Sequence, residues 1–265
     1  MNWEEAVAFV RSDPSQQKLV IDYFFDDPLP AACERYRAST EWAAVRKMLP
    51  VKRGSVLEVG AGRGIAAYAL AMDGWEVTAL EPDPSPIVGA AAIESLNGTT
   101  PARIRVVQTW GEKLPFGDAT FDLVFCRQAL HHAHDLRLLC CEMARVLKGH
   151  GQMVAIREHV LSSRQDLPTF LNNHPMHRYY GGENAYLLEE YLDAMKQAGL
   201  RITEVCNPLS SDVNLYPLTQ AELKQRIAKK YRIPSPALIP DWILRLKGSL
   251  MNTPGRPYSF IAEKP

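Results

Sequence analysis

The residues with the clearest chemical potential lie in one short stretch, where three glycines follow an acidic side chain. Residues 56–64 read VLEVGAGRG, and an alanine-rich run predicted as a helix follows them directly. Gly60 would allow a tight turn, Gly62 would let the backbone approach a ligand, and Gly64 would permit close packing of the helix. This G-x-G-x-G spacing differs from the G-x-G-x-x-G pattern that seats a pyrophosphate on a helix.

Two acidic side chains near this turn indicate the kind of ligand that would bind there. Glu58 lies two residues before the first glycine, where a carboxylate would repel a diphosphate and attract an ammonium group. Glu81 ends the next predicted strand, where an acid can accept hydrogen bonds from both hydroxyls of a ribose. A ligand with an ammonium group and a ribose but no phosphate fits both observations.

These residues need a scaffold, and the hydrophobic pattern predicts one of alternating strands and helices. The expected strands are 55–60, 75–81, 104–110, 121–126, 151–158, 201–206 and 257–264, and the expected helices are 65–72, 85–96, 136–147 and 187–198. The predicted fold class is α/β, with a Rossmann-like, seven-stranded, mostly parallel sheet covered on both faces. Ligands of such sheets bind beyond the carboxyl ends of the strands.

Two regions outside this alternation set the predicted domain organisation. Residues 1–50 read as an N-terminal helical segment, and 51–207 together with 257–265 form the predicted core. Within the core, 158–185 is too long for an ordinary connection. Residues 208–256 carry helical apolar spacing, and we expect them to form an inserted helical lid over the substrate. Packing for stability alone is the alternative.

Composition and charge exclude several classes of function. Thirty basic side chains balance thirty acidic ones, which excludes a strong overall attraction to nucleic acid or to an anionic membrane. No apolar stretch approaches the roughly 18 residues that span a bilayer. The five cysteines form no C-x-x-C pair and no signal-peptide pattern is visible, so we expect a cytoplasmic protein without a zinc finger. The oligomeric state stays open.

Four motifs together resemble the class I S-adenosylmethionine-dependent methyltransferases, in particular small-molecule enzymes of the methyltransferase type 11 kind. They are EVGAGRG at 58–64, the strand-terminal Glu81, LPF with FDLV within 114–124, and ALHH at 129–132. The resemblance covers about residues 50–207. It implies S-adenosylmethionine as the cofactor and an antiparallel last strand at the C-terminus.

The resemblance also implies a set of cofactor contacts. Glu58 and the glycine-rich turn would hold the methionine moiety, and Glu81 would bind the ribose hydroxyls. The further cofactor residues that it implies are Gly60, Ala61, Gly62, Gly64, Pro82, Trp110, Gly111, Glu112, Cys126 and Arg127. Trp110 stands where the family commonly has an aspartate, and it would stack on adenine instead of accepting a hydrogen bond. Arg35 or Arg37 would pair with the methionine carboxylate, with solvated helix charge as the alternative.

Methyl transfer from a sulfonium is an in-line displacement, so the protein must position the acceptor and, for a hydroxyl, remove a proton. The candidate catalytic residues follow the fourth and fifth predicted strands and are His131, His132, Glu158 and His159. A stretch rich in imidazoles and phenols suits recognition of the acceptor through His174, His177, Tyr179 and Tyr180. No metal is expected, because the alternative set of His159, His174 and His177 lacks carboxylates at fixed offsets.

The resulting hypothesis is S-adenosylmethionine-dependent methylation of a small molecule such as a sugar, a phenol or a quinone-like ring, with a histidine as candidate general base. Two other hypotheses stay open at this point. One is a catalytically inactive relative that serves as a binding protein or scaffold, and the other is a nucleotide-dependent oxidoreductase. The hypothesis leaves the identity of the acceptor and the methylated atom open.

Overall fold

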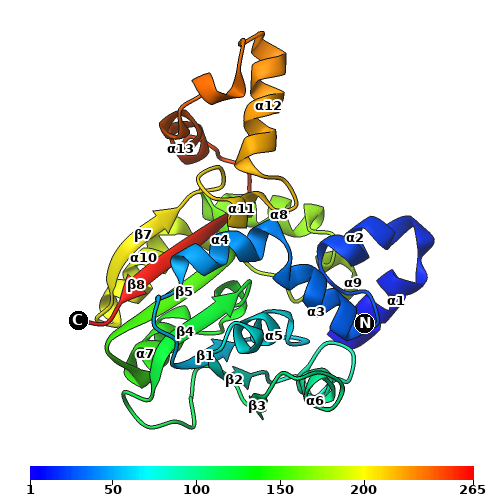
Figure 1. Cartoon of the computed structure of the whole chain (residues 1–265), viewed down its shortest axis with the longest axis vertical. Coiled ribbons are helices and arrows are strands. Elements are labelled where there is room, and N and C mark those ends of the chain that lie inside the picture. The colour runs from blue at the N-terminus through cyan, green and yellow to red at the C-terminus, as the bar shows by residue number, and fades with distance from the viewer.

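A single twisted sheet forms the centre of the computed structural model, which describes all of residues 1–265 (Figure 1). The strands are β1 (Ser55–Val59), β2 (Glu76–Leu80), β3 (Ile104–Val107), β4 (Phe121–Arg127), β5 (Leu147–Leu161), β6 (Tyr186–Leu187), β7 (Arg201–Cys206) and β8 (Arg256–Glu263). Their order is β3-β2-β1-β4-β5-β8-β7, and the short β6 pairs with β5. All seven predicted strands are present, and the two-residue β6 is too short to produce a sequence pattern.

The strand directions confirm the predicted Rossmann-like sheet. Strands β1 to β5 pair in parallel, whereas β8 runs antiparallel to both of its neighbours, β5 and β7. The central strands β1 and β4 are buried along most of their length, as expected for parallel strands covered on both faces. At the outer edge, β7 is largely exposed.

Helices cover both faces of the sheet. The α-helices of the chain are α1 (Trp3–Ser12), α2 (Gln17–Asp22), α3 (Leu29–Arg37), α4 (Thr40–Met48), α5 (Ile65–Met72), α6 (Ala90–Thr99), α7 (Leu136–Val146), α8 (Leu167–Asn173), α9 (His177–Tyr180), α10 (Leu188–Gln197), α11 (Asp212–Leu215), α12 (Gln220–Tyr231) and α13 (Asp241–Ser249). Helices α3, α4 and α5 bury Tyr36, Trp42 and Leu70 in one apolar cluster. On the other face, α7 and α10 bury Met143 and Tyr191 in a second cluster.

Helix α6 begins later than the sequence pattern indicates. The hydroxyl of Ser85 accepts hydrogen bonds from the backbone N–H groups of Ile87 and Val88, at 2.9 and 3.1 Å, and this holds the preceding segment in a turn. The helix therefore starts at Ala90 instead of Ser85. Serine side chains commonly compete with helix formation in this way.

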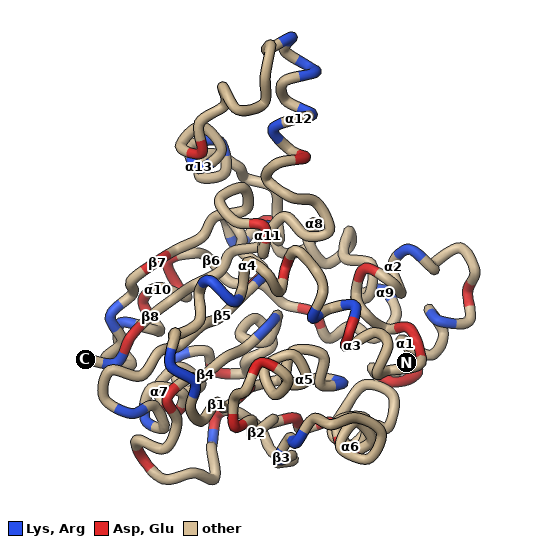
Figure 2. Tube along the Cα trace, viewed as in Figure 1, with Lys and Arg blue, Asp and Glu red and all other residues tan.

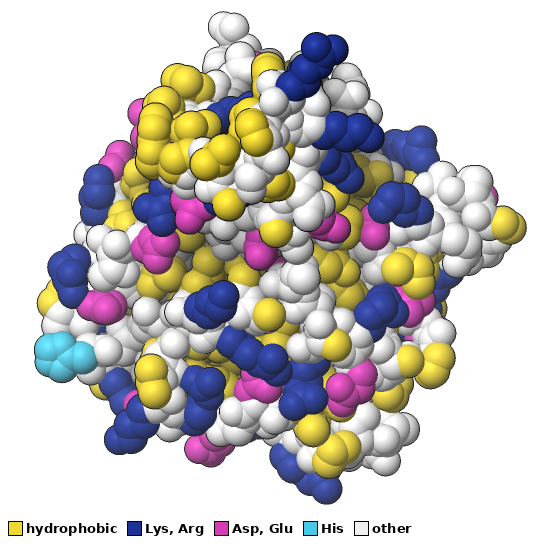
Figure 3. All heavy atoms as spheres, turned by 45° about the horizontal axis from the view of Figure 1, so that its top comes forward, with side chains coloured by type: hydrophobic (Ala, Val, Ile, Leu, Met, Phe, Trp, Pro, Cys, Tyr) yellow, Lys and Arg dark blue, Asp and Glu magenta, His cyan; other side chains and the backbone are white.

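The two regions outside the core differ in where they lie. The N-terminal segment is helical, as predicted, and contributes α1 to α4. After β5, the chain forms α8 and α9 beside the same end of the sheet, whereas α12 and α13 project away from the body of the molecule (Figure 1). This projection exposes apolar side chains over α13 (Figure 3), among them Trp242 and Leu246. No helix of the structure has the length and apolar character that crossing a bilayer requires.

Candidate active site

A cavity of about 500 Å³ opens at the carboxyl ends of the parallel strands, where the topology predicts a ligand site. The turn after β1 contributes Gly60 and Gly62, and the segment after β2 contributes Glu81. The segment after β4 contributes His131, and β5 itself contributes His159. The fold therefore brings the glycine-rich turn, the strand-terminal acid and the predicted catalytic histidines into one site.

The glycine-rich turn has the conformation that its residue types require. Gly60, Gly62 and Gly64 adopt φ angles of +68°, +54° and +84°, which lie in the left-handed region that favours glycine. A Cβ atom on Gly60 would lie 2.8 Å from the Cβ atom of Ala129, which is too close for any side chain. At Gly64 it would lie 3.1 to 3.3 Å from Ile93 and Leu96, so this glycine permits packing and does not line the cavity.

Glu81 folds back onto this turn and lines the cavity. Its Oε2 atom accepts a hydrogen bond from the backbone N–H of Gly62 at 2.6 Å, and its Oε1 atom accepts one from the N–H of Asp83 at 3.0 Å. Burial raises the pKa of Glu81 to about 7, although both hydrogen bonds oppose the rise. Each oxygen keeps a further lone pair that a ligand hydroxyl can use.

Glu58 is a second acid of the cavity, and it is left partly unpartnered. Its side chain is buried, and its Oε2 atom has no hydrogen-bond partner. Burial raises the pKa of Glu58 well above its usual value, while the nearby Arg127 guanidinium lowers it. Arg127 is in turn held by Glu41, whose oxygens accept hydrogen bonds from it at 2.6 and 3.1 Å. This acid is therefore poised to receive a positively charged or hydrogen-bond-donating ligand group.

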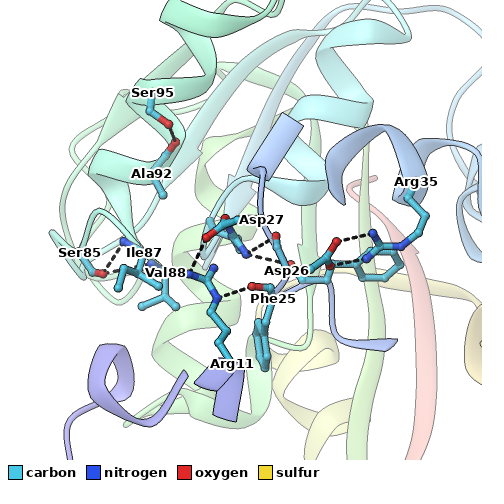
Figure 4. A network of polar contacts seen from close by, with 12 residues as sticks. Arg11, Phe25, Asp26, Asp27, Arg35, Ser85, Ile87, Val88, Ala92 and Ser95 are labelled. Carbon is cyan, nitrogen blue, oxygen red and sulfur yellow. Dashed lines mark hydrogen bonds and ion pairs between the residues drawn. The ribbon is translucent and has the colours of Figure 1, made fainter. Parts of the chain in front are cut away.

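The N-terminal segment closes one side of the cavity, and Arg63 of the glycine-rich turn holds it in place. The Arg63 guanidinium donates to the backbone oxygens of Phe24 and Asp26, at 3.2 and 3.1 Å, and to the carboxylate of Asp27 at 2.6 Å. In Figure 4, Arg11 reaches the Phe25 carbonyl and Asp27 from the other side. Trp3, Tyr23 and Phe25 line the cavity as a result.

The structure does not bring Arg35 or Arg37 to the cavity. Arg35 pairs with Asp26 at 2.5 Å (Figure 4), and Arg37 lies 3.5 Å from both Glu34 and Asp73. Neither arginine lines the cavity. Both lie on α3, which packs on the outer side of α5, so local acids attract them away from the site. The guanidinium groups that do line the cavity belong to Arg63 and Arg127.

The far wall of the cavity is formed by the segment that follows β3. The Trp110 side chain is 59% exposed, and its ring centroid lies 5.3 Å from that of His134. A Cβ atom on Gly111 would lie 2.6 Å from the Cδ1 atom of Leu139, so any larger residue at this position would have to displace that side chain. Glu112 accepts a hydrogen bond from the His134 backbone N–H at 2.9 Å. The three residues predicted to flank a flat ring thus line one wall together.

Across the cavity from Glu58 and Glu81, the buried imidazole of His131 lies between two carboxylates. The Nδ1 atom of His131 lies 2.7 Å from the Oε2 atom of Glu158, and its Nε2 atom lies 3.6 Å from the Oε2 atom of Glu183. Both carboxylates raise the pKa of His131 to about 9, against the effect of burial. Tyr180 donates its hydroxyl to Glu183 at 2.5 Å.

Three further histidines surround this group, and their surroundings disfavour the charged imidazole. Partial desolvation and the nearby His131 lower the pKa of His132 to about 4, and burial lowers the pKa values of His159 and His174. The Nδ1 atoms of His132 and His159 lie 3.2 and 3.0 Å from the carbonyl oxygens of Gly182 and Gly255, respectively. A donated Nδ1–H in these contacts leaves both Nε2 atoms as acceptors.

The structure brings most of the predicted site residues together. Those that line the cavity are Glu58, Gly60, Ala61, Gly62, Glu81, Pro82, Trp110, Gly111, Glu112, Arg127, His131, His132, His159, His174 and Tyr180. Glu158 lies behind His131 and does not line the cavity. Cys126 lies buried within β4, and neither it nor His177 or Tyr179 lines the cavity.

Residues 208–256, which we predicted to form a lid, do not cover the cavity in this structure. No residue of 208–256 lines the cavity, because α12 and α13 project away from it (Figure 1). The cover comes from the N-terminal segment and from the loop after β5, which supplies His174, Met176 and Glu183. Sequence reasoning did not assign a contact to Arg63, which lies within the glycine-rich motif, or to Glu183, which lies three residues after Tyr180. Tyr23 and Phe25 lie in a short stretch rich in acidic and aromatic residues, and nothing else in the sequence indicated that they line a cavity.

Comparison with known proteins shows that this chain is similar to methyltransferases. Residues 57–155 match the model of a family described as a methyltransferase domain. The uncharacterized methyltransferase YcgJ of Bacillus subtilis is 32% identical over 118 residues, which cover 44% of this chain and 46% of that protein. The ubiquinone biosynthesis O-methyltransferase of Rickettsia conorii is 26% identical over 149 residues, 56% of this chain and 45% of that protein. The chain thus spans less than half the length of either relative.

A solved methyltransferase structure has a similar fold. Phosphoethanolamine N-methyltransferase 2 of Haemonchus contortus, solved with phosphomonomethylethanolamine and S-adenosylhomocysteine, aligns with a TM-score of 0.60 at 19% identity. The alignment covers 100% of this chain and 60% of that one. The comparisons confirm the resemblance drawn from the sequence motifs and the predicted fold.

Proposed function

We propose that this protein is an S-adenosylmethionine-dependent methyltransferase that transfers the methyl group to a small molecule; the match of residues 57–155 to a methyltransferase domain supports the proposal. One observation carries the proposal: two acids that line one cavity have lone pairs without a partner in the protein. Glu58 has an unpartnered Oε2 atom, and Glu81 holds the glycine-rich turn while keeping acceptor capacity. A nucleoside with an ammonium group satisfies both.

The cofactor would extend across the cavity from one wall to the other. Its ribose hydroxyls would donate to Glu81, and its ammonium group would donate to Glu58. Its adenine would lie against Trp110 and Gly111. The methionine carboxylate would meet Arg63, whose Nε atom is buried and has no partner. A zwitterionic ligand end therefore complements two buried groups of opposite charge that the protein alone leaves incompletely paired.

The acceptor would be small and polar. The cavity of about 500 Å³ is enclosed partly by aromatic side chains, in the size range of small-molecule sites. Basic and acidic residues are interspersed along the chain (Figure 2), and the charged residues that line the cavity are mostly acidic, which does not favour nucleic acid as the acceptor. The wall opposite Glu81 is built from imidazoles and a carboxylate, which suits an acceptor that carries a hydroxyl or an amine.

Within that wall, His132 is the imidazole best placed to take a proton from the acceptor. Its Nδ1 atom contacts the Gly182 carbonyl, and its side chain is 41% exposed, so the Nε2 lone pair faces accessible space. The His131 side chain is only 1% exposed, and its ring nitrogens face Glu158 and Glu183, so it is less accessible to the acceptor than His132. Glu158 orients His131, and His159 is tied to the backbone at Gly255. In-line attack on the sulfonium would then follow deprotonation.

Calorimetry on the purified chain tests the cofactor assignment. S-adenosylhomocysteine is expected to bind at micromolar concentration, and NAD is not expected to bind. Release of S-adenosylhomocysteine in the presence of panels of phenols, sugars and amines would identify the acceptor. The His132→Ala variant should lower kcat for a hydroxyl acceptor by about 10²-fold or more while leaving affinity for S-adenosylhomocysteine unchanged. NAD binding, or no binding of S-adenosylhomocysteine at saturating concentration, would refute the proposal.

A further inference from the structure

The acceptor wall of the cavity contains three side chains that converge on one point. His131, His159 and Glu183 each place one potential ligand atom so that all three atoms lie within 4.8 Å of one another. They come from three separate segments: the short helix η2 (Leu130–His132), strand β5 and the loop after α9. All three residues line the cavity.

Both imidazoles are held through the ring nitrogen that points away from this point. Glu158 lies 2.7 Å from the Nδ1 atom of His131, and the Gly255 carbonyl lies 3.0 Å from the Nδ1 atom of His159. Metal-binding histidines are oriented in the same way, because a carboxylate or a backbone carbonyl that accepts the Nδ1–H fixes the Nε2 atom as the ligand. In the neutral form of each ring, with the proton on Nδ1, the Nε2 atoms of both histidines are free to bind an ion.

The carboxylate of Glu183 is unusual because it is buried without being satisfied. Its side chain is 6% exposed, and its Oε2 atom has no hydrogen-bond partner. The distance of 3.6 Å between this Oε2 atom and the Nε2 atom of His131 is too long for a hydrogen bond. Two atoms that bind one zinc ion tetrahedrally at about 2.1 Å lie roughly 3.4 Å apart. The spacing therefore fits two ligands of one ion. Tyr180 orients the carboxylate by donating to its other oxygen at 2.5 Å.

We propose that His131, His159 and Glu183 form a site for a divalent first-row transition-metal ion. Two imidazoles and one carboxylate suit zinc, iron or cobalt, whereas magnesium and calcium prefer oxygen ligands alone. Three protein ligands leave coordination positions open toward the cavity, as in catalytic metal sites. The sequence analysis argued against a metal site at His159, His174 and His177 because that set has no carboxylate ligand. The site proposed here keeps only His159 of that set and gains a carboxylate from Glu183.

The role of the ion rests on the proposed function, although its binding does not. An acceptor hydroxyl that binds the ion would lose its proton more readily. The O–H bond would break with the proton moving to the Nε2 atom of His132. The acceptor oxygen would then form its bond to the methyl carbon as the carbon–sulfur bond breaks, which releases S-adenosylhomocysteine. The ion would thus position the acceptor opposite the sulfonium as well as activate it.

Cobalt titration of the full-length, chelator-treated protein tests the site directly. One equivalent of Co²⁺ is expected to bind with visible d–d absorption, to be displaced by Zn²⁺, and to be unaffected by excess Mg²⁺. We expect His159→Ala and Glu183→Gln to weaken Co²⁺ binding by at least about 10²-fold, and Glu158→Gln, a positioning variant, by about 10- to 100-fold. His150→Ala, at an exposed histidine of β5, is the matched control and should bind as the unaltered protein does.

The outcomes separate this proposal from the cofactor assignment. Circular dichroism and affinity for S-adenosylhomocysteine, measured without metal, show whether each variant has folded. Co²⁺ binding that is absent in the unaltered chain, or that survives both His159→Ala and Glu183→Gln, would overturn the metal site. S-adenosylhomocysteine binding would still stand in that case. Conversely, a chain that binds Co²⁺ through these residues but no S-adenosylhomocysteine would refute the proposed function alone.

Discussion

Replacing Glu81 with glutamine is the sharpest test of the cofactor pose. In the structure, both carboxylate oxygens accept a backbone N–H, from Gly62 at 2.6 Å and from Asp83 at 3.0 Å. The ribose hydroxyls would use the remaining lone pairs. An amide keeps one acceptor oxygen, but its NH₂ group would face either a backbone N–H or a ribose hydroxyl as a second donor. At least one charge-assisted hydrogen bond to the ligand is then lost.

The magnitude follows from the energy of that bond. Hydrogen bonds to charged groups contribute about 1.5–3 kcal/mol, and each 1.4 kcal/mol is a factor of ten in affinity. The Kd for S-adenosylhomocysteine should therefore rise about 10- to 100-fold in Glu81→Gln. Titration calorimetry measures it, with Glu76→Gln as the control, because Glu76 is an exposed acid that begins the same strand. Unchanged affinity in Glu81→Gln would show that the ribose does not lie on this acid.

The same acid makes affinity depend on pH. Burial raises the pKa of Glu81 to about 7, so the free protein loses the ionised acceptor as the pH falls through this value. Only the ionised form offers acceptors to both backbone donors and both hydroxyls. With a pKa near 7, the ionised fraction falls about tenfold between pH 8 and pH 6, and affinity should weaken by about the same factor. In Glu81→Gln this contribution should vanish, and an equally steep profile in the variant would assign the pH dependence to another group.

Three further substitutions test other parts of the site. Gly62→Val should abolish S-adenosylhomocysteine binding in calorimetry and lower the free energy of unfolding by about 1–2 kcal/mol, because Gly62 has a φ angle of +54°; full affinity would contradict the turn as a ligand contact. Arg63→Ala should release the segment that contains Phe24 and Asp27, which limited proteolysis would detect as faster cleavage there. Trp242→Ser should leave S-adenosylhomocysteine affinity within about twofold, since no residue of α13 lines the cavity; a large loss would restore the lid hypothesis.

The local signals in the sequence determined the core of the fold. Alternating apolar strands and helices specify a parallel sheet, because each segment shows its own periodicity and its own caps or turns. The glycine-rich turn and Glu81 lie within a few residues of strand ends, and the topology rule then places them at the same edge. The sequence also favoured a ligand without phosphate, because Glu58 precedes that turn.

Tertiary packing alone decided which side chains meet at the acceptor wall. Glu183 lies 52 residues beyond His131 in the chain, yet its carboxylate comes within 3.6 Å of that imidazole. Neither residue carries a local pattern that records this distance. The same holds for the arginines: Arg37 is drawn to Asp73, whereas Arg63 faces the cavity and binds the N-terminal segment.

The position of the insertions was likewise undetermined by the sequence. The sequence shows one amphipathic stretch that opens at Thr219 and Glu222 and another that carries Trp242 and Leu246, and the structure forms α12 and α13 there. Periodicity and capping can be recognised in this way because they are properties of one segment. The direction in which such a helix leaves the core depends on contacts with distant segments, and here it leads away from the cavity (Figure 1). Local sequence patterns thus determined the helices, the strands and the glycine-rich turn. Long-range packing determined which segments cover the cavity and brought His131, His159 and Glu183 together.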